Sequence, residues 1–133
     1  MSPEQTIRIG DITFDVLSPR LMAQFWAAAL RYEVQEVTEE FASVIDPTGR
    51  SPRCCFQKVE APKIGKNRVH LDLYASDMDA EVTRLIALRA QSLGHREDEG
   101  VIWTVMLDIE GNEFCVQPPP YPSPEIEPPN RVK

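Results

Sequence analysis

Residues able to carry chemistry alternate with apolar residues along three short segments of the sequence. Successive side chains of a β-strand point to opposite faces of a sheet, so the polar residues of one segment share a face. A purely structural polar face more often carries Lys, Thr and Glu, whereas these segments carry His, Cys, Asp and Tyr. We therefore expect them to line a cavity for a small molecule. The three polar sets are Asp11, Thr13 and Asp15; His70, Asp72 and Tyr74; and Glu113, Cys115 and Gln117.

His70 and Glu113 are the candidate acid and base groups, and Asp72 is the candidate residue that orients His70. An imidazole beside a carboxylate is positioned for proton transfer near neutral pH. Alternatives remain open for both groups. His70 either acts in the pocket or only hydrogen-bonds across the sheet, and Glu113 is a general base, a cation-binding group or a partner for Arg53 on the matching strand of the first half.

Aromatic residues that could wall a pocket for a planar ligand are Trp103, Trp26 and Phe41. Trp26 stands at helical spacing with Met22 and Ala29, which predicts a core position. The face of Trp103 depends on a strand register that the sequence leaves open. The residues expected to contact the ligand are Asp11, Thr13, Asp15, Gln57, Tyr74, Trp103 and Gln117.

Two similar copies of one pattern must position these residues. Each copy has an alternating strand, a helix that ends in Ala-Leu-Arg, and then three strands, so the sequence predicts an α+β fold of two βαβββ repeats. Ser18-Pro19 and Ser76 or Asp77 supply the two helix starts. The expected strands are 9–17, 32–37, 41–45 and 53–58 in the first copy, and 69–75, 91–96, 101–107 and 113–117 in the second.

Proline placement sets the domain boundaries. Of the 12 prolines, seven fall in the run PPPYPSPEIEPP that begins at Pro118, a segment with no apolar stripe. We expect one domain over residues 5–118, with repeats at about 8–60 and 67–118, and a proline-rich extended tail over 119–133.

Composition excludes several function classes. The formal net charge of −7 argues against a nucleic-acid or anionic-membrane surface, both of which need basic patches. No apolar run approaches the length of a membrane span. Three cysteines, two of them adjacent, make a poor disulfide framework and indicate reduced thiols in a cytoplasmic protein. Glycine-rich phosphate loops and Gly-x-Ser-x-Gly motifs do not occur.

The motifs FWAAAL, NRVHLDL and WTVMLDIEGNEFCV, set in two βαβββ copies, resemble the glyoxalase/bleomycin resistance/dioxygenase group, which is the vicinal oxygen chelate superfamily. The likeness is greatest to its small bacterial glyoxalase-like domains. It implies a curved eight-stranded mixed sheet with helices on the outer face and a cavity on the inner face, and it implies a homodimer. It leaves the reaction open, because the superfamily includes lyases, isomerases, epimerases, dioxygenases and drug-binding proteins.

The resemblance also implies where a divalent metal would bind. Family members with a metal take one ligand from the first and one from the last strand of each copy. With RCCFQ laid on EFCVQ, so that Gln57 matches Gln117, those positions are Asp11, Cys55, His70 and Cys115. Only His70 matches the family pattern, since both usual glutamates are replaced by cysteine.

A second departure from the family lies at the helix ends. The family usually has Gly after the helix-ending Leu, where this sequence has Arg31 and Arg89. Either these arginines take the left-handed conformation that favours Gly, under strain, or the helices end differently.

Three hypotheses for function follow. The first is a glyoxalase-like domain that binds a small organic substrate and does lyase or isomerase chemistry. The second is a non-catalytic binding or drug-sequestering protein of the resistance type. The third is an interaction module whose proline-rich tail docks on a partner.

Overall fold

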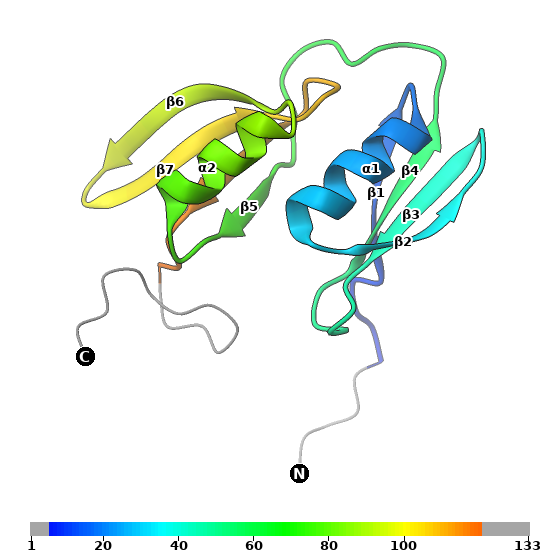
Figure 1. The fold of residues 1–133 in the computed structure, drawn as a ribbon, viewed down its shortest axis with the longest axis horizontal. Helices are drawn as coiled ribbons and strands as arrows, with labels where there is room; N and C mark the ends of the chain where they lie inside the picture. The colour runs from blue at the N-terminus through cyan, green and yellow to red at the C-terminus, as the bar shows by residue number, and fades with distance from the viewer. Residues whose placement is uncertain (1–5, 121–133) are drawn as a thin grey trace. The chain divides into compact units, whose positions relative to one another are not determined.

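The computed structural model describes residues 6–120 (Figure 1). These residues fall into two compact units, which divide between Pro62 and Lys63. Each unit contains one strand, one helix and three further strands in that order. The strands of each unit are hydrogen-bonded as a four-stranded mixed sheet. This confirms the predicted α+β fold of two βαβββ repeats.

The first unit comprises β1 (Asp11–Val16), α1 (Pro19–Leu30), β2 (Glu33–Val37), β3 (Phe41–Ile45) and β4 (Arg53–Lys58). The sheet order is β1-β4-β3-β2, with β1 parallel to β4 and the other pairs antiparallel. Phe14 on β1 packs between Trp26 of α1 and Phe56 of β4, at centroid distances of 5.6 and 5.3 Å. Trp26 is fully buried, which confirms its predicted core position.

The second unit comprises β5 (Leu71–Tyr74), α2 (Met78–Ala87), β6 (Gln91–Asp98), β7 (Val101–Leu107) and β8 (Glu113–Gln117). The sheet order β5-β8-β7-β6 repeats that of the first unit, again with the outer strand β5 parallel to β8. Met78 of α2 accepts a hydrogen bond on its sulfur from the buried Thr104 hydroxyl of β7, at 3.5 Å. The face of β7 that carries Thr104 and Met106 therefore meets the helix, and the alternate residues face the other way.

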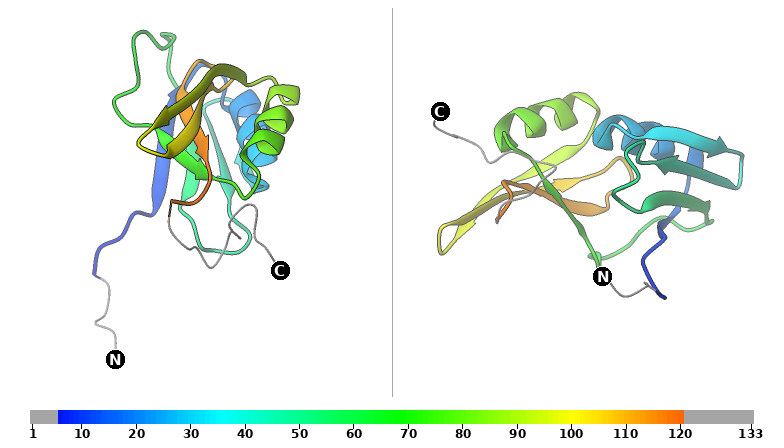
Figure 2. Two further views of the ribbon diagram at one scale, coloured as in Figure 1. Left: turned by 90° about the vertical axis from the view of Figure 1, so that its left-hand side faces the viewer. Right: turned by 90° about the horizontal axis from the view of Figure 1, so that it is seen from below.

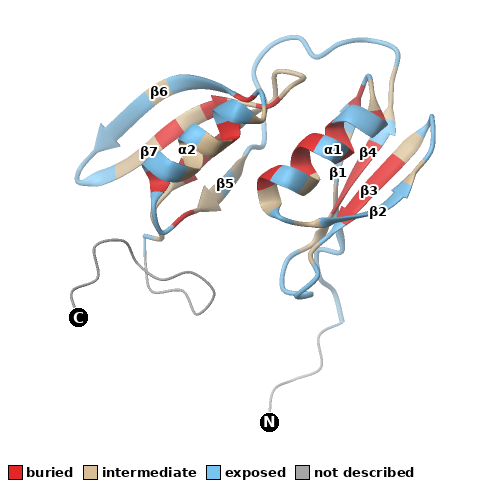
Figure 3. Cartoon of the chain, in the orientation of Figure 1, coloured by how far each residue is buried: buried red, intermediate tan, exposed pale blue. Residues whose placement is uncertain are grey.

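Both helices lie along one face of their own sheet (Figure 2), and the buried residues gather where helix and sheet meet (Figure 3). In both units the alternation predicted from the sequence is observed. Phe14 in the first unit is half-buried against the core residues Trp26 and Phe56, and Phe114 in the second is fully buried. Asp11 and Asp72 on the alternate positions are exposed. The polar sets thus share the sheet face opposite the helix.

Helix ends follow local chemistry closely. The Ser18 hydroxyl accepts the Leu21 N–H at 3.2 Å, and the Asp77 carboxylate accepts the Ala80 N–H at 3.0 Å, so both helices have side-chain N-caps. At the other end Arg31 has φ 56° and Arg89 has φ 85°. Both arginines therefore adopt the strained left-handed conformation, and of the two alternatives for these positions this one is correct.

The strand ranges agree with the sequence expectation apart from a few ends. β6 continues to Asp98 instead of stopping at Arg96, because it pairs with β7 down to the tight turn at Glu99-Gly100. β5 begins at Leu71 instead of Val69, so His70 lies directly before the strand. The proline-rich tail falls outside the described residues from position 121 onward. Among residues 6–120 there is no helix with the length and apolar character that crossing a membrane requires.

Candidate functional site

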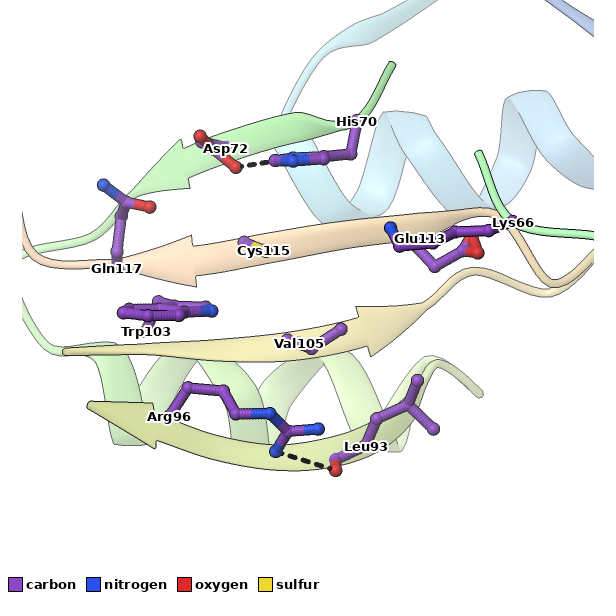
Figure 4. Close-up of a pocket in the computed structure, with 10 residues that line it drawn as sticks. All are labelled: Lys66, His70, Asp72, Leu93, Arg96, Trp103, Val105, Glu113, Cys115 and Gln117. Atoms are coloured by element: carbon purple, nitrogen blue, oxygen red, sulfur yellow. Dashed lines mark hydrogen bonds and ion pairs between the residues drawn. The ribbon is translucent and has the colours of Figure 1, made fainter. Parts of the chain in front are cut away.

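A pocket of about 600 Å³ lies on the second unit's sheet, on the face turned away from α2 (Figure 4). It draws on all four strands of that sheet and on the segment that leads into β5. Six of the expected site residues take part in it. The lining residues are Lys66, His70, Asp72, Leu93, Arg96, Trp103, Val105, Glu113, Cys115 and Gln117.

Strand register explains why these side chains converge. Asp72 is paired with Cys115 across β5 and β8, and Cys115 is paired with Val105 across β8 and β7. Trp103, two residues before Val105, is paired with Arg96 on β6. Side chains on paired positions lie on the same face, so each cross-strand row points into the pocket.

His70 and Asp72 form a hydrogen-bonded pair at the β5 side of the pocket. His70 Nδ1 lies 2.9 Å from Asp72 Oδ1, and their side chains are 43% and 44% exposed. The ligand atoms of His70, Asp72 and Cys115 all lie within 4.8 Å of one another. These three residues are the most concentrated group of potential proton donors, acceptors and metal ligands in the pocket.

Cys115 is a protonated thiol in this setting. Burial raises its pKa, and the neighbouring Asp72 carboxylate raises it further through its charge and by accepting a hydrogen bond from the thiol. The positive charges of Lys66 and Arg96 act in the opposite direction without reversing the shift. A thiol with a raised pKa is a poor nucleophile near neutral pH.

Glu113 is held by the chain segment that precedes β5. Its carboxylate accepts the Asn67 N–H at 3.1 and 3.2 Å, and the Lys63 ammonium lies 3.3 Å away. The Asn67 side-chain amide also donates to the backbone carbonyl of Glu113, at 3.2 Å. Desolvation raises the pKa of Glu113, but the hydrogen bonds from Asn67 and Lys63 outweigh it, so the net pKa is lowered. A group with these partners is an ionised anchor for residues 63–67.

The polar face of the first unit is occupied by an internal network. Arg53 donates to both carboxylate oxygens of Asp11 at 2.9 Å and, with a third N–H, to Gln35 at 2.9 Å. Gln35 also accepts from the buried Ser43 hydroxyl at 3.0 Å. The Arg53 guanidinium lowers the pKa of Asp11 despite some desolvation. Arg53 is therefore the partner of Asp11, and Glu113 pairs instead with Lys63 and Asn67.

The remaining expected residues occupy different settings. Cys55 is buried beside Thr13 in the paired register, and burial raises the pKa of its thiol. Asp15 and Gln57 are paired across β1 and β4 and are both exposed. Tyr74 is paired with Gln117 at the end of β5, but it is not among the residues that line the second unit's pocket.

The metal ligands that the superfamily implies do not fit these residues as a set of four. Asp11 already has both oxygens on Arg53, and Cys55 is a buried thiol with a raised pKa. Thiolates also favour softer metals than the oxygen ligands of a usual glutamate do. The smaller group of His70, Asp72 and Cys115 is different, since its donor types suit zinc and lie together.

Sequence reasoning missed two cations in this pocket, Lys66 and Arg96. These cations accompany the carboxylates of Asp72 and Glu113, so the pocket carries charges of both signs. Arg96 could have been found from the sequence only with the β6–β7 register, and a bulge between Ser92 and Gly94 shifts that register. Trp103, whose face the sequence left open, lines the pocket.

The fold of two βαβββ repeats is that of the vicinal oxygen chelate superfamily. A model of the glyoxalase-like domain family matches residues 11–117, so the chain belongs to the glyoxalase-like domain family. A search of curated protein sequences gave no significant match.

Solved structures with the same fold support this assignment. A glyoxalase/bleomycin resistance protein/dioxygenase family enzyme from Burkholderia phytofirmans PsJN has a TM-score of 0.70 at 16% identity, covering 82% of this chain and 96% of its own. Lactoylglutathione lyase from Agrobacterium tumefaciens has a TM-score of 0.64 at 14% identity, covering 87% and 96%. A manganese complex of the fosfomycin resistance protein FosX from Listeria monocytogenes has a TM-score of 0.68 at 12% identity, covering 86% and 90%. At these identities the likeness concerns the fold.

Proposed function

We propose that the second unit's pocket binds a small organic molecule and that His70, oriented by Asp72, transfers a proton to or from it. The observation that carries the proposal is the 2.9 Å hydrogen bond between His70 and Asp72 at the edge of a pocket of about 600 Å³. Pockets of this size, with apolar walls and a few convergent polar groups, are typical of small-molecule sites. Lyases among the proteins of similar fold are consistent with such chemistry.

The pairing with Asp72 decides which nitrogen of His70 reacts. When Nδ1–H donates to the carboxylate, the neutral imidazole carries its lone pair on Nε2. Asp72 also stabilises the imidazolium that forms once Nε2 has taken a proton. His70 is therefore the general base, Asp72 is a positioning residue, and Trp103 and Val105 supply apolar contacts that hold the ligand.

A non-catalytic binding protein is the second candidate, and the position of Glu113 favours it. A complete acid–base reaction often needs two groups on opposite sides of the reacting atoms, but Glu113 is already engaged by Asn67 and Lys63. A pocket with one base and an aromatic wall suits sequestration as well as catalysis. The first experiment must therefore separate binding from proton transfer.

Nuclear magnetic resonance makes that separation, because the chain has only two histidines. His95 is exposed and is not among the lining residues, so its ring signals are the internal control. We expect a pocket ligand from a library of small acids, amines and neutral rings to shift the His70 signals alone. A library in which no compound moves His70 relative to His95 would refute the binding proposal.

Proton transfer is then tested on the ligand itself. In D₂O, a base acting on an acidic C–H of the bound ligand catalyses hydrogen–deuterium exchange, which we expect to be lost in His70→Gln and reduced in Asp72→Asn. Binding without exchange would leave the sequestration function and reject the enzyme. Metal analysis of untagged protein and of Cys115→Ser decides whether His70, Asp72 and Cys115 also hold zinc, as their mutual distance permits.

Two further expectations from the family belong to the same proposal. We propose that the chain forms a homodimer and works in the cytoplasm, where its three cysteines stay reduced. Analytical ultracentrifugation of the untagged protein tests the dimer, and cell fractionation tests the compartment.

A further inference from the structure

Arg96 is held over the pocket by the backbone of its own strand. Its Nη1 group donates to the carbonyls of Leu93 and His95, each at 3.3 Å. Among residues 6–120 no ion pair of Arg96 with a carboxylate is formed. A guanidinium has five N–H donors in a planar fork, so anchoring one nitrogen leaves the Nη2 and Nε donors for a ligand. In Figure 4 the Arg96 side chain runs along β6 toward Leu93, and its guanidinium lies below Val105, on the pocket side of the strand.

A bulge at Gly94 makes room for this conformation. The β6–β7 register shifts between Ser92 and Gly94, and Gly94 has φ +113°, a conformation that residues with a Cβ rarely adopt. A Cβ at Gly94 would lie 3.0 Å from Nη1 of Arg96. The bulge therefore both bends the edge strand and leaves the space into which the guanidinium folds.

The pocket has charge at its two sides and an apolar centre. His70 and Asp72 come from the β5 side of the sheet, whereas Arg96 comes from β6, the opposite edge strand. Between them Cys115 and Val105 are paired across β8 and β7 and form the floor. The two edge strands β5 and β6 are three strand spacings apart, which is roughly 14 Å at about 4.8 Å each. With a contact of about 3 Å at each end, a ligand of roughly 8 Å reaches both sides.

Trp103 supplies a wall beside this floor. In Figure 4 its ring lies between Gln117 and Arg96, on the β7 strand. An indole beside an apolar floor favours a flat π-system over a puckered aliphatic frame, because stacking adds to the area that is buried.

Resting on the proposed function of this pocket, we propose that the ligand is a planar aromatic carboxylate of about two fused rings. Its carboxylate binds the Arg96 fork, its ring lies on Cys115 and Val105 against Trp103, and its far end reaches His70. A bidentate carboxylate–guanidinium contact fixes both the charge and the orientation of the ligand. The rings then present one end to the histidine base.

Three probes test this on the full chain by isothermal titration calorimetry. They are 2-naphthoate, its neutral amide 2-naphthamide, and decalin-2-carboxylate, which keeps the carboxylate on a saturated, puckered frame. We expect wild type to bind 2-naphthoate about tenfold or more tightly than either of the others, which is the scale of one charge-assisted hydrogen-bond pair or one stacked ring.

Arginine variants identify the group responsible. Arg96→Met should weaken 2-naphthoate binding about tenfold and leave 2-naphthamide within about twofold, while Arg96→Lys, which keeps the charge and loses the fork, should fall between. Arg68→Met is the matched control, because Arg68 is exposed, lies in the same unit and does not line the pocket. Thermal melting of each variant checks that the fold is retained.

Several results would overturn the inference. Equal binding of 2-naphthoate and 2-naphthamide would do so. The same holds if Lys66→Met loses the preference for 2-naphthoate over 2-naphthamide while Arg96→Met keeps it. Equal binding of decalin-2-carboxylate would reject the planar ring. In each of these cases the proposed binding function of the pocket would survive, whereas a library in which no compound moves His70 would reject that function as well.

Discussion

Replacing Glu113 by Gln tests whether Glu113 is a structural anchor or a catalytic base. The carboxylate accepts the Asn67 N–H with both oxygens, at 3.1 and 3.2 Å, and pairs with Lys63 at 3.3 Å, with its side chain only 14% exposed. Glutamine keeps the shape and one acceptor oxygen but removes the charge. We therefore expect the variant to be less stable and its 63–67 segment to be held less firmly.

The size of the loss follows from these contacts. A hydrogen bond to a charged group contributes about 1.5–3 kcal/mol, roughly twice a neutral one, and glutamine retains the neutral part. The partly exposed pair with Lys63 adds about 0.2–1 kcal/mol. We expect Glu113→Gln to lower the free energy of unfolding by about 1–2 kcal/mol at neutral pH, measured by urea unfolding with far-ultraviolet circular dichroism.

The dependence of the free energy of unfolding on acidic pH gives an independent check, because the direction of its change is fixed. The folded pKa of Glu113 lies below its ordinary value of 4.5, so its stabilisation is fully present above that value and is lost as the pH falls through the folded pKa. Wild type should therefore lose this contribution on acidification, whereas Glu113→Gln has no such charge to lose. The stability gap between the two proteins should close at low pH.

Controls make the result specific to Glu113. Glu97→Gln removes a carboxylate from the exposed strand β6 of the same unit, and we expect it to change stability by less than about 0.5 kcal/mol. Lys63→Met should lose only the smaller ion-pair part. The anchor role is refuted if Glu113→Gln matches Glu97→Gln in stability, or if its gap from wild type persists unchanged well below pH 4.5.

Three further predictions concern other parts of the chain. Arg89→Gly should stabilise the protein by about 0.5–1 kcal/mol in thermal unfolding, because φ 85° suits Gly better than Arg; an unchanged or lower melting temperature would contradict this. Burial raises the pKa of Cys54 to about 11. Native Cys54 should therefore resist a thiol reagent at neutral pH and react on unfolding. The free energy of unfolding should also fall as the pH rises from the ordinary pKa of 9.0 to about 11. Asp11→Asn should weaken the acid dependence of stability, because the Arg53 guanidinium lowers the pKa of Asp11 and that stabilisation is lost as pH falls through the folded value. The measurement is urea unfolding across the acidic range, with Asp15→Asn on the same strand as the control.

The fold was predictable because the sequence signals for its helices and strands are local and occur in both copies of the repeat. Ser18-Pro19 and Asp77 mark the helix starts, and the alternation around Phe14 and Phe114 assigns one face of each sheet to the core. The strand ends at Asp98 and Leu71 were less predictable, since they depend on pairing with a neighbouring strand.

The candidate site was predictable only in part, because it depends on which side chains meet. The pair of His70 and Asp72 follows from their two-residue spacing, although β5 itself begins only at Leu71. Arg96 required the register between two strands and the bulge at Gly94 that shifts it. The partners of Glu113 lie in an irregular segment that carries no periodic signal, so the sequence left its role open between three alternatives.

The two copies of the repeat have used the same polar face differently. In the first unit polar groups of this face are hydrogen-bonded to one another, since Arg53 donates to both carboxylate oxygens of Asp11 and also to Gln35. In the second unit the residue in the place of Asp11 is His70, whose partner Asp72 lies two residues further along the chain. The cation Arg96 is anchored by the backbone carbonyls of Leu93 and His95. An arginine that is paired with a carboxylate of its own unit rigidifies the sheet. An arginine anchored by neutral carbonyls still has an unneutralised charge with which to bind a ligand. This difference between the two copies supports the proposal that the ligand binds to the second one.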